Sequence, residues 1–213
     1  MSTYLFDFDG TLVDSMPTYA GVMLRILDEN QVVYGEDILK IITPLGYKGA
    51  AAYFKTLGMP LSEEEIVNTV TRYAVEAYTN SVPAKAHVID VLRALHARGD
   101  SLNVLTASPH MMLDPCLRRL GVFDLFDHVW SCEDFGTTKA DPAIYHMAAE
   151  AIGQPVGDIL FLDDNLNADL TARSAGMKVC GVYDDSSKEY EDDIRAASDF
   201  YIRSFDELMH ISF

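Results

Sequence analysis

The sequence of 213 residues contains no apolar run that approaches the roughly 20 residues needed by a membrane-spanning helix. Its amino terminus enters an apolar segment at Tyr4 without a preceding basic stretch, so no cleaved signal peptide is expected and a cytoplasmic location is the default. The three cysteines, Cys116, Cys132 and Cys180, are odd in number and widely spaced. This pattern argues against a disulfide framework or a zinc site and favours reduced, buried thiols.

Positive charge is also scarce. The chain has 16 Lys and Arg against 33 Asp and Glu, which gives a formal net charge of −17. Such a chain repels nucleic-acid phosphates and anionic lipid, so neither kind of partner is expected. The same charge opposes a small phosphorylated substrate unless a divalent cation reverses the sign locally.

Hydrophobic residues make up 49% of the chain, which is enough for a packed core. Short apolar runs that end in polar residues, typical of buried strands, lie at 5–8, 102–105, 159–162 and 179–182. Weaker strand candidates lie at 129–130 and 200–202, and helical spacing of apolar residues lies between the runs. This alternation predicts an α/β fold, a Rossmann-like parallel sheet core with helices on both faces.

Residues 16–82 break the alternation, because they show helical periods and no clear strand. Tyr19 to Leu27 form one apolar stripe, and Ser62 with Glu65 fits a capping box that begins another helix. We therefore expect an all-helical insert at 16–82 after the first strand, and a core domain made of 1–15 and 83–213.

The first polar cluster contains two carboxylates. Asp7 and Asp9 stand at the end of a predicted buried strand, and Gly10 allows the chain to turn sharply there. Ligands of open parallel sheets bind beyond the carboxyl ends of the strands. Because two such carboxylates repel each other unless they share a cation, a metal site is favoured over a turn capped by aspartates.

Three further clusters follow later strands or precede a helix. Thr106 and Ala107 could bind phosphate oxygens or cap the next helix, and Lys139 could reach the site or lie on the surface. Asp163 and Asp164 are adjacent acids after an apolar run, which favours a metal role. Oxygen ligands without histidine or thiolate favour Mg²⁺ over zinc.

Together the clusters resemble the haloacid dehalogenase-like (HAD) superfamily, in that family's order along the chain. Residues 7–15, Asp-x-Asp-Gly-Thr-Leu-x-Asp-Ser, look like its first motif, Thr106 its second, Lys139 its third and Asp163-Asp164 its fourth. The insert looks like the helical C1 cap of subfamily I, so the resemblance covers the whole chain. The sequence is most similar in kind to the phosphoglycolate phosphatase and β-phosphoglucomutase-like group.

The resemblance implies a Mg²⁺-dependent phosphatase that acts on a small phosphomonoester. Asp7 would be the nucleophile that forms an aspartyl-phosphate, and Asp9 would act as acid and then base. The metal would be held by Asp7, the backbone carbonyl of Asp9 and Asp164. The residues expected to bind the phosphate are Thr106, Ala107, Lys139 and Gly10. Thr106 and Lys139 are expected to be catalytic residues as well.

The fourth motif departs from the family's frequent spacing, in which another aspartate follows four residues after the first. Here Ala168 occupies that position and Asp169 comes one residue later. We expect Asp164 as the ligand with Asp163 as the second choice. Asp169 is the alternative support for the metal, or a helix N-terminal acid favoured by the helix dipole.

In related enzymes a cap loop contacts the part of the substrate beyond the phosphate. Residues 43–49 look like that loop, with Tyr47 and Lys48 as candidate contacts; an ordinary connection between helices is the alternative. His110 could reach the site or be a surface histidine. Phosphoglycolate, sugar phosphates and nucleoside monophosphates all suit a C1 cap, and the sequence does not choose among them.

Two other functions remain open. A β-phosphoglucomutase-like phosphomutase would share all four clusters, and a non-catalytic phosphometabolite-binding protein would keep the fold. A small phosphorylated metabolite is the expected partner, and a monomer or homodimer is the expected state.

Overall fold

A computed structural model describes the backbone of residues 1–213 and every side chain except that of Pro44. The chain divides into two compact units. The core unit comprises Met1–Asp14 and Pro83–Phe213, and the helical unit comprises Ser15–Val82. The boundary between residues 82 and 83 is the one expected from the sequence, and the first boundary lies one residue earlier than expected.

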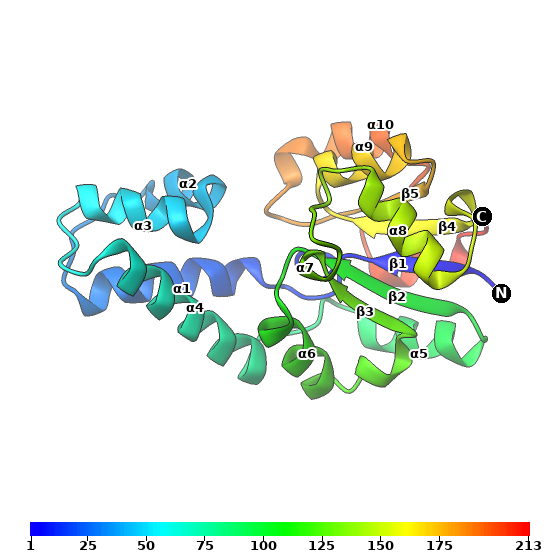
Figure 1. The fold of residues 1–213 in the computed structure, drawn as a ribbon, viewed down its shortest axis with the longest axis horizontal. Helices are drawn as coiled ribbons and strands as arrows, with labels where there is room; N and C mark the ends of the chain where they lie inside the picture. Colours follow the sequence, from blue (N-terminus) through cyan, green and yellow to red (C-terminus); the bar gives the residue numbers. More distant parts are fainter. The chain divides into compact units, whose positions relative to one another are not determined.

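The core unit is built on a six-stranded sheet with the order β3-β2-β1-β4-β5-β6, in which all neighbouring strands are parallel (Figure 1). The predicted Rossmann-like parallel sheet is therefore confirmed, and both weaker strand candidates belong to it. Its strands are β1 (Thr3–Phe6), β2 (Ser101–Thr106), β3 (His128–Ser131), β4 (Ile159–Asp163), β5 (Lys178–Val182) and β6 (Phe200–Ile202).

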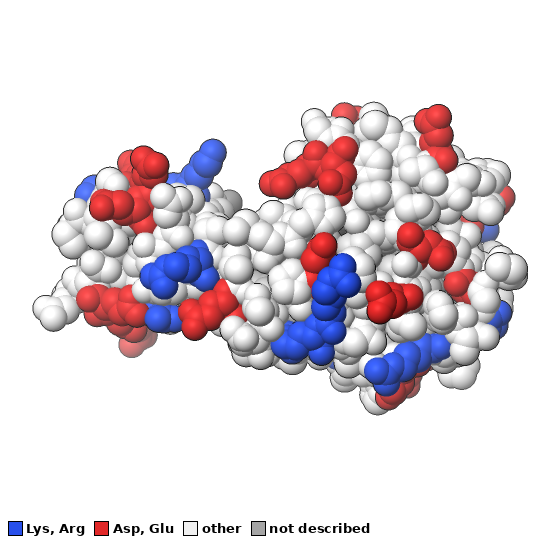
Figure 2. Space-filling model, turned by 60° about the horizontal axis from the view of Figure 1, so that its bottom comes forward, with Lys and Arg blue, Asp and Glu red and all other residues white. Residues whose placement is uncertain are grey.

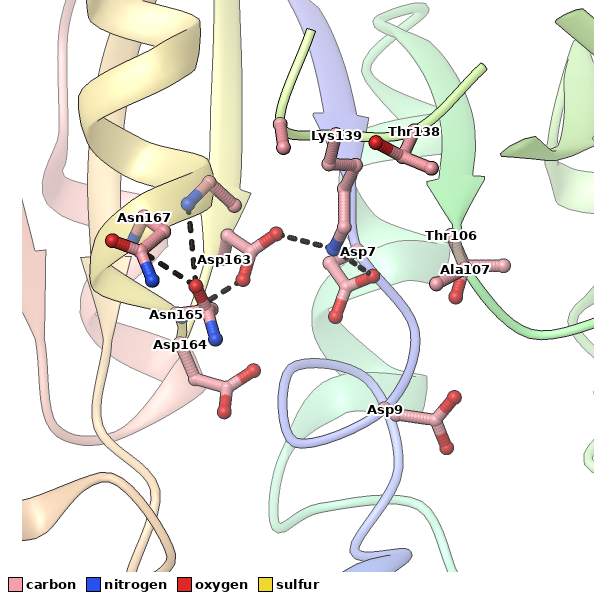
Figure 3. Close-up of a pocket in the computed structure, with 12 residues that line it drawn as sticks. Asp7, Asp9, Thr106, Ala107, Thr138, Lys139, Asp163, Asp164, Asn165 and Asn167 are labelled. Carbon is pink, nitrogen blue, oxygen red and sulfur yellow. Dashed lines mark hydrogen bonds and ion pairs between the residues drawn. The ribbon is translucent and has the colours of Figure 1, made fainter. Parts of the chain in front are cut away.

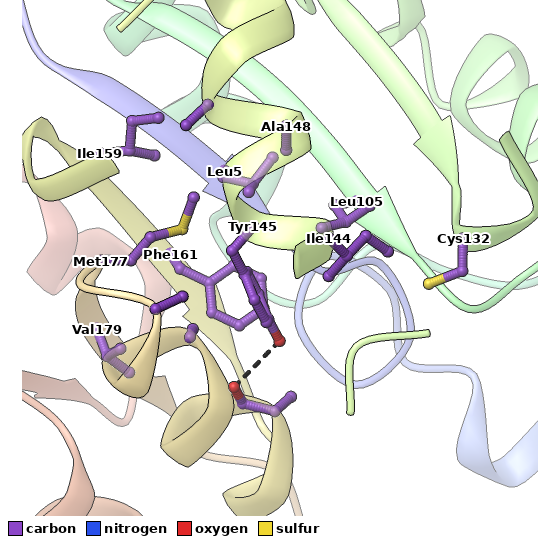
Figure 4. Close-up of a cluster of buried hydrophobic side chains, with 14 residues drawn as sticks. Leu5, Leu105, Cys132, Ile144, Tyr145, Ala148, Ile159, Phe161, Met177 and Val179 are labelled. Atoms are coloured by element: carbon purple, nitrogen blue, oxygen red, sulfur yellow. Dashed lines mark hydrogen bonds between the residues drawn. The ribbon is translucent and has the colours of Figure 1, made fainter. Parts of the chain in front are cut away.

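Helices cover both faces of the sheet (Figure 1). Successive side chains of a strand point to opposite faces. Leu5 accordingly joins a buried cluster with Tyr145 and Phe161 (Figure 4), whereas Phe6 packs against Phe205. The α-helices of this unit are α5 (Val88–Ala97), α6 (His110–Arg119), α7 (Cys132–Phe135), α8 (Ala143–Ile152), α9 (Leu166–Ser174) and α10 (Glu191–Ala197). Its 3₁₀ helices are η2 (Phe123–Leu125), η3 (Val156–Asp158), η4 (Lys188–Tyr190) and η5 (Phe205–His210).

The described residues of the helical unit form helices and no strand, as the missing strand pattern predicted. The capping box of Ser62 and Glu65 is present at the start of α4. Residues 43–49, expected to be a loop, are helical instead; Pro44, whose side chain lies outside the described part, belongs to this segment. The elements are α1 (Met16–Glu29), α2 (Ile38–Ile42), η1 (Thr43–Leu45), α3 (Gly46–Thr56) and α4 (Glu63–Asn80).

The surface carries the acidic excess of the composition. On the face drawn in Figure 2, acidic side chains are spread over both units and the basic side chains form separate groups. No helix among the described residues is long and apolar enough to cross a membrane. The three cysteines are free and buried, as their spacing predicted.

One buried carboxylate of the core unit is unusual. Asp169, in the first turn of α9, is 0% exposed, and neither carboxylate oxygen has a hydrogen-bond partner among the described residues. Burial raises the pKa of Asp169 well above its ordinary value, and the negative charges of Asp163 and Asp164 raise it further. Its position at a helix N-terminus agrees with one of the two expectations, but a buried acid without a partner costs stability.

We expect Asp169→Asn to stabilise the metal-free protein by about 1–3 kcal/mol at pH 8 and by less near pH 4. A carboxyl group with a higher pKa in the folded state destabilises the fold progressively as the pH rises above the unfolded pKa, near 4. Denaturant unfolding at several pH values in chelator measures this difference. Glu150→Gln, which neutralises an exposed acid on α8, is the matched control and should change little at any pH. A wild-type pH dependence in Asp169→Asn would contradict the interpretation.

Candidate active site

Asp7 follows the last residue of the central strand β1, between β2 and β4. Its backbone N–H donates to the carbonyl of Leu162, 2.8 Å away, so the sheet pairing continues to this residue. Its side chain is buried at the carboxyl ends of the strands, where the sequence placed the ligand site.

Lys139 reaches this position from the loop that precedes α8. Its Nζ donates to Asp7 Oδ1 and Asp163 Oδ2, each 2.6 Å away (Figure 3). The loop is held locally, because the hydroxyl of Tyr145 lies 3.0 Å from the Lys139 carbonyl and Asp141 Oδ1 accepts the N–H of Ala143. Lys139 is therefore the partner of two acids, with only 14% of its side chain exposed, and not a surface lysine.

These residues line a cavity of about 400 Å³ in the core unit. It includes Asp7 and Asp9 of the first motif, the end of β2, and the loops before α8 and α9. The lining residues are Asp7, Asp9, Thr106, Ala107, Thr138, Lys139, Ala140, Asp163, Asp164, Asn165, Asn167 and Ala168.

Three carboxylates of this cavity can hold one cation together. One oxygen each of Asp7, Asp163 and Asp164 lies within 4.8 Å of the others. Carboxylate oxygens are the ligands that Mg²⁺ prefers, and one ammonium cannot balance three acids of which two are buried and one is half-buried. The donor set therefore fits a hard divalent cation. The geometry places Asp163, and not Asp169, with Asp7 and Asp164.

The pKa values reflect the same excess of negative charge. Burial raises the pKa of Asp7 to about 7, with Lys139 opposing the shift and Asp163 adding to it. Burial and the charge of Asp163 also raise the pKa of Asp164 well above its ordinary value. Burial lowers the pKa of Lys139, but Asp163 and Asp7 outweigh it and the pKa lies well above its usual value. A bound cation would oppose the upward shifts of the acids.

The turn after Asp9 lies directly against Asp164. Gly10 has a φ of +79°, and a Cβ at this position would lie 2.5 Å from an Asp164 carboxylate oxygen. Only glycine fits both the conformation and the space. Thr11 Oγ1 donates to Asp164 Oδ1 across 3.3 Å, so the turn both makes room for this carboxylate and orients it.

The side chain of Asp9 does not join that of Asp7, although the sequence suggested that their two carboxylates would share a cation. It points away from Asp7 and Asp164 in Figure 3 and forms a hydrogen bond with Ser108 instead. Its carboxylate is not part of the three-acid group found among the described residues. The expected ligand was its backbone carbonyl, so the side chain remains available for proton transfer.

Thr106 ends β2 beside the cavity, and Ala107 and Ser108 follow it. Thr106 is buried, and its Oγ1 accepts the N–H of Ser108 at 3.1 Å. The next helix begins at His110, which does not line the cavity. Its ring nitrogens lie 2.8 Å from Asp114 and from Asp134, and these two hydrogen bonds raise the pKa of His110.

Tyr47 and Lys48, the candidate substrate contacts, belong to the first turn of α3 and not to a loop. The ring of Tyr47 stacks on that of Tyr19 within the helical unit, with centroids 5.7 Å apart. Lys48 is exposed.

Sequence reasoning missed several polar residues of the cavity wall. Thr138 adjoins Lys139, and Asn167 lies in the first turn of α9. Asn165 caps α9, since its Oδ1 accepts the N–H groups of Asn167 and Ala168 at 3.0 and 3.2 Å. The signal for Asn165 was available, because asparagine before a helix is a common N-cap. Thr138 and Asn167 carried no comparable signal.

Comparison with known proteins agrees with this architecture. A model of the haloacid dehalogenase-like hydrolase family matches residues 1–176. The phosphoglycolate phosphatase of Salmonella paratyphi A is 30% identical over 200 residues, which span 83% of this chain and 79% of that protein.

Two solved structures are similar over almost their whole length. A candidate β-phosphoglucomutase from Thermotoga maritima gives a TM-score of 0.85 at 20% identity, with 100% of both chains covered. The candidate HAD-hydrolase YfnB of Bacillus subtilis, bound to magnesium, gives 0.83 at 19% identity, with 98% of this chain and 97% of that chain covered. At these identities the two structures bear on the fold alone. The family match over residues 1–176 and the phosphatase relative show more: the chain belongs to the haloacid dehalogenase-like hydrolases and is an enzyme of that family.

Proposed function

We propose that this enzyme is a Mg²⁺-dependent phosphatase that hydrolyses a small phosphomonoester through an aspartyl-phosphate on Asp7. The observation that carries the proposal is the buried Asp7 carboxylate, held by Lys139 and grouped with Asp163 and Asp164. A carboxylate fixed in this way has one oxygen bound to an ammonium and the other free to attack phosphorus. The phosphatase relative supports the same reaction class.

In the first half of the reaction, an oxygen of Asp7 attacks phosphorus and the bond from phosphorus to the ester oxygen breaks. Asp9 gives its proton to the leaving oxygen, which requires its side chain to rotate away from Ser108. In the second half, Asp9 takes a proton from a water molecule, and that water attacks the phosphorus of the aspartyl-phosphate. The bond between phosphorus and the Asp7 oxygen breaks. Inorganic phosphate leaves, and the Asp7 carboxylate is restored.

Asp7, Asp164 and the Asp9 carbonyl would hold the cation, with Asp163 beside them. When bound, Mg²⁺ would neutralise charge on the phosphoryl oxygens and on the surrounding carboxylates. The groups assigned to the phosphoryl oxygens are the Thr106 hydroxyl, the Lys139 ammonium, and the backbone N–H groups of Ala107 and Gly10.

We assign the helical unit as a C1 cap that excludes water and selects the leaving group, with Tyr47 and Lys48 as contacts. Phosphoglycolate, sugar phosphates and nucleoside monophosphates are the candidate substrates. An anionic or hydroxyl-rich leaving group suits a lysine contact. A screen of phosphomonoesters with and without Mg²⁺ tests the proposal most directly.

Asp7→Asn should reduce kcat by roughly 10³-fold or more while the protein stays folded, because the amide cannot form the phosphoenzyme. Initial rates, melting temperature and acid-quench trapping of labelled phosphate on the protein measure this. Hydrolysis at the wild-type rate would exclude Asp7 as nucleophile. A non-catalytic binding protein would instead keep its function in Asp7→Asn, because binding needs no nucleophile.

Removal of divalent metal should abolish turnover, and Mg²⁺ should restore it. Mg²⁺ at about 100 times its Kd should also stabilise the fold by about 2.7 kcal/mol, since the cation binds only the folded site. Thermal unfolding with chelator and with Mg²⁺ measures the stabilisation, and Asp164→Asn should reduce it. Turnover that is indifferent to chelation would reject the proposal.

Lys48→Ala should change the preference among phosphomonoesters and leave the rate on a minimal aryl phosphate nearly unchanged. Lys40→Ala removes another exposed lysine of the helical unit and serves as the control. Values of kcat/KM across the substrate panel measure the change. Equal losses on every substrate would exclude a selective role for Lys48.

A hexose 1-phosphate separates the phosphatase from the phosphomutase that shares its clusters. Release of free phosphate identifies the hydrolase, and formation of the isomeric hexose phosphate identifies the mutase. Time-resolved product analysis distinguishes them.

A further inference from the structure

Lys85 lies three residues beyond the helical unit, where the chain has returned to the core unit. Its side chain is 19% exposed, and its ammonium is enclosed by three oxygens. Nζ donates to the carbonyl of Gly10 at 2.5 Å, to the carbonyl of Tyr183 at 2.6 Å and to Asp184 Oδ2 at 2.9 Å. Three donor positions thus meet three acceptors, which is the full capacity of an ammonium group.

The three acceptors come from two segments that are distant in sequence. Gly10 belongs to the turn after Asp7, and the other two follow β5. The backbone adds to the connection, since Lys85 N donates to Leu12 O and Asp14 N donates to Pro83 O, each at 3.0 Å. Lys85 therefore ties the turn of the first motif to the end of β5.

Gly10 links the hydrogen bonds of Lys85 to the group of three acids in the cavity. Its Cα leaves no room for a side chain next to the Asp164 carboxylate, and its neighbour Thr11 donates to that carboxylate. A displacement of Gly10 would therefore change the space and the hydrogen bond that orient Asp164. Groups that orient ligands in this way commonly change metal affinity when they are removed.

Asp184 completes the arrangement electrostatically. It is buried, and its Oδ1 accepts the N–H and the hydroxyl of Ser186, which leaves Oδ2 for Lys85. Burial raises the pKa of Asp184, but the hydrogen bonds from Ser186 and Lys85 outweigh it and the pKa is lowered. The charge of Asp184 also acts on Asp164. Lys85 therefore compensates a negative charge that would otherwise add to the acidic group.

We propose that Lys85 is a positioning residue for the cation site, which holds the Gly10 turn against Asp164 without touching the cation or the substrate. This inference rests on the Mg²⁺ dependence proposed above. It predicts that loss of Lys85 weakens cation binding by more than a general loss of stability explains.

The test uses Lys85→Met/Asp184→Asn, which removes both charges of the pair and so keeps the local net charge. The matched control is Arg98→Met/Asp100→Asn, which removes another ion pair, with Arg98 Nε 2.6 Å from Asp100 Oδ2. This pair lies just before β2, at the amino-terminal end of the strand, away from the acids. Titration calorimetry with MgCl₂, without substrate, gives the Kd. Melting temperature in chelator gives the stability of each variant.

We expect the Mg²⁺ Kd to rise about tenfold in Lys85→Met/Asp184→Asn and to stay at the wild-type value in the control. The melting temperature should fall in both. Lys85→Arg, which keeps the charge and several donors, should recover most of the affinity. If the double variant does not fold, Lys85→Gln replaces it, with the same weakening expected.

A wild-type Kd in the folded Lys85 variants would overturn the inference, and so would an equal rise in the control. Failure of the proposed function would give a different result in these measurements. In that case the wild-type enzyme itself binds no Mg²⁺ or turns over in chelator.

Discussion

The ammonium of Lys139, enclosed between Asp7 and Asp163, is the interaction on which the geometry of the site depends. It fixes one oxygen of each carboxylate at 2.6 Å and brings the loop before α8 onto the ends of β1 and β4. Buried acids are stable only when they are paired, and Asp164 adds a third acid to the group. The ammonium therefore orders the site without neutralising it, and burial, with the charge of Asp163, raises the pKa of Asp7 to about 7 despite its partner.

The turn at Gly10 connects this arrangement to Asp164, the third acid of the group. Lacking a side chain, Gly10 lets the backbone approach Asp164, and its positive φ turns the chain away immediately after Asp9. The Asp164 carboxylate therefore owes its space to Gly10. The bond from Lys85 to the Gly10 carbonyl then links the turn to the segment after β5. The cation site is thus supported from both sides of the central strands.

Much of this arrangement could be predicted from the sequence, because apolar runs ending in acids identify both the strands and the edge where ligands bind. The runs before Asp7 and Asp163 are examples. The conformation of 43–49 could not be predicted, because Gly46 and Gly49 suggest a loop whereas burial of the following residues in the helical unit favours a helix. The partners of Asp9 and Lys85 were equally inaccessible. The partner of Asp9 depends on the rotamer of its side chain. The partners of Lys85 include backbone carbonyls that lie 75 and 98 residues away in the sequence.

A chain with a net charge of −17 can accommodate an anionic substrate only if the balance is local. With the proposed divalent cation bound, its charge and that of one ammonium would together balance the three grouped carboxylates, so a phosphate would meet a neutral site and not a negative one. On the proposed function, attraction would then come from oriented donors, namely the Thr106 hydroxyl and the N–H groups after β1 and β2. Such donors recognise the phosphoryl group and are indifferent to the rest of the substrate. Discrimination between phosphomonoesters would therefore have to come from residues outside the cluster of acids, which is the task that the proposal gives to the helical unit.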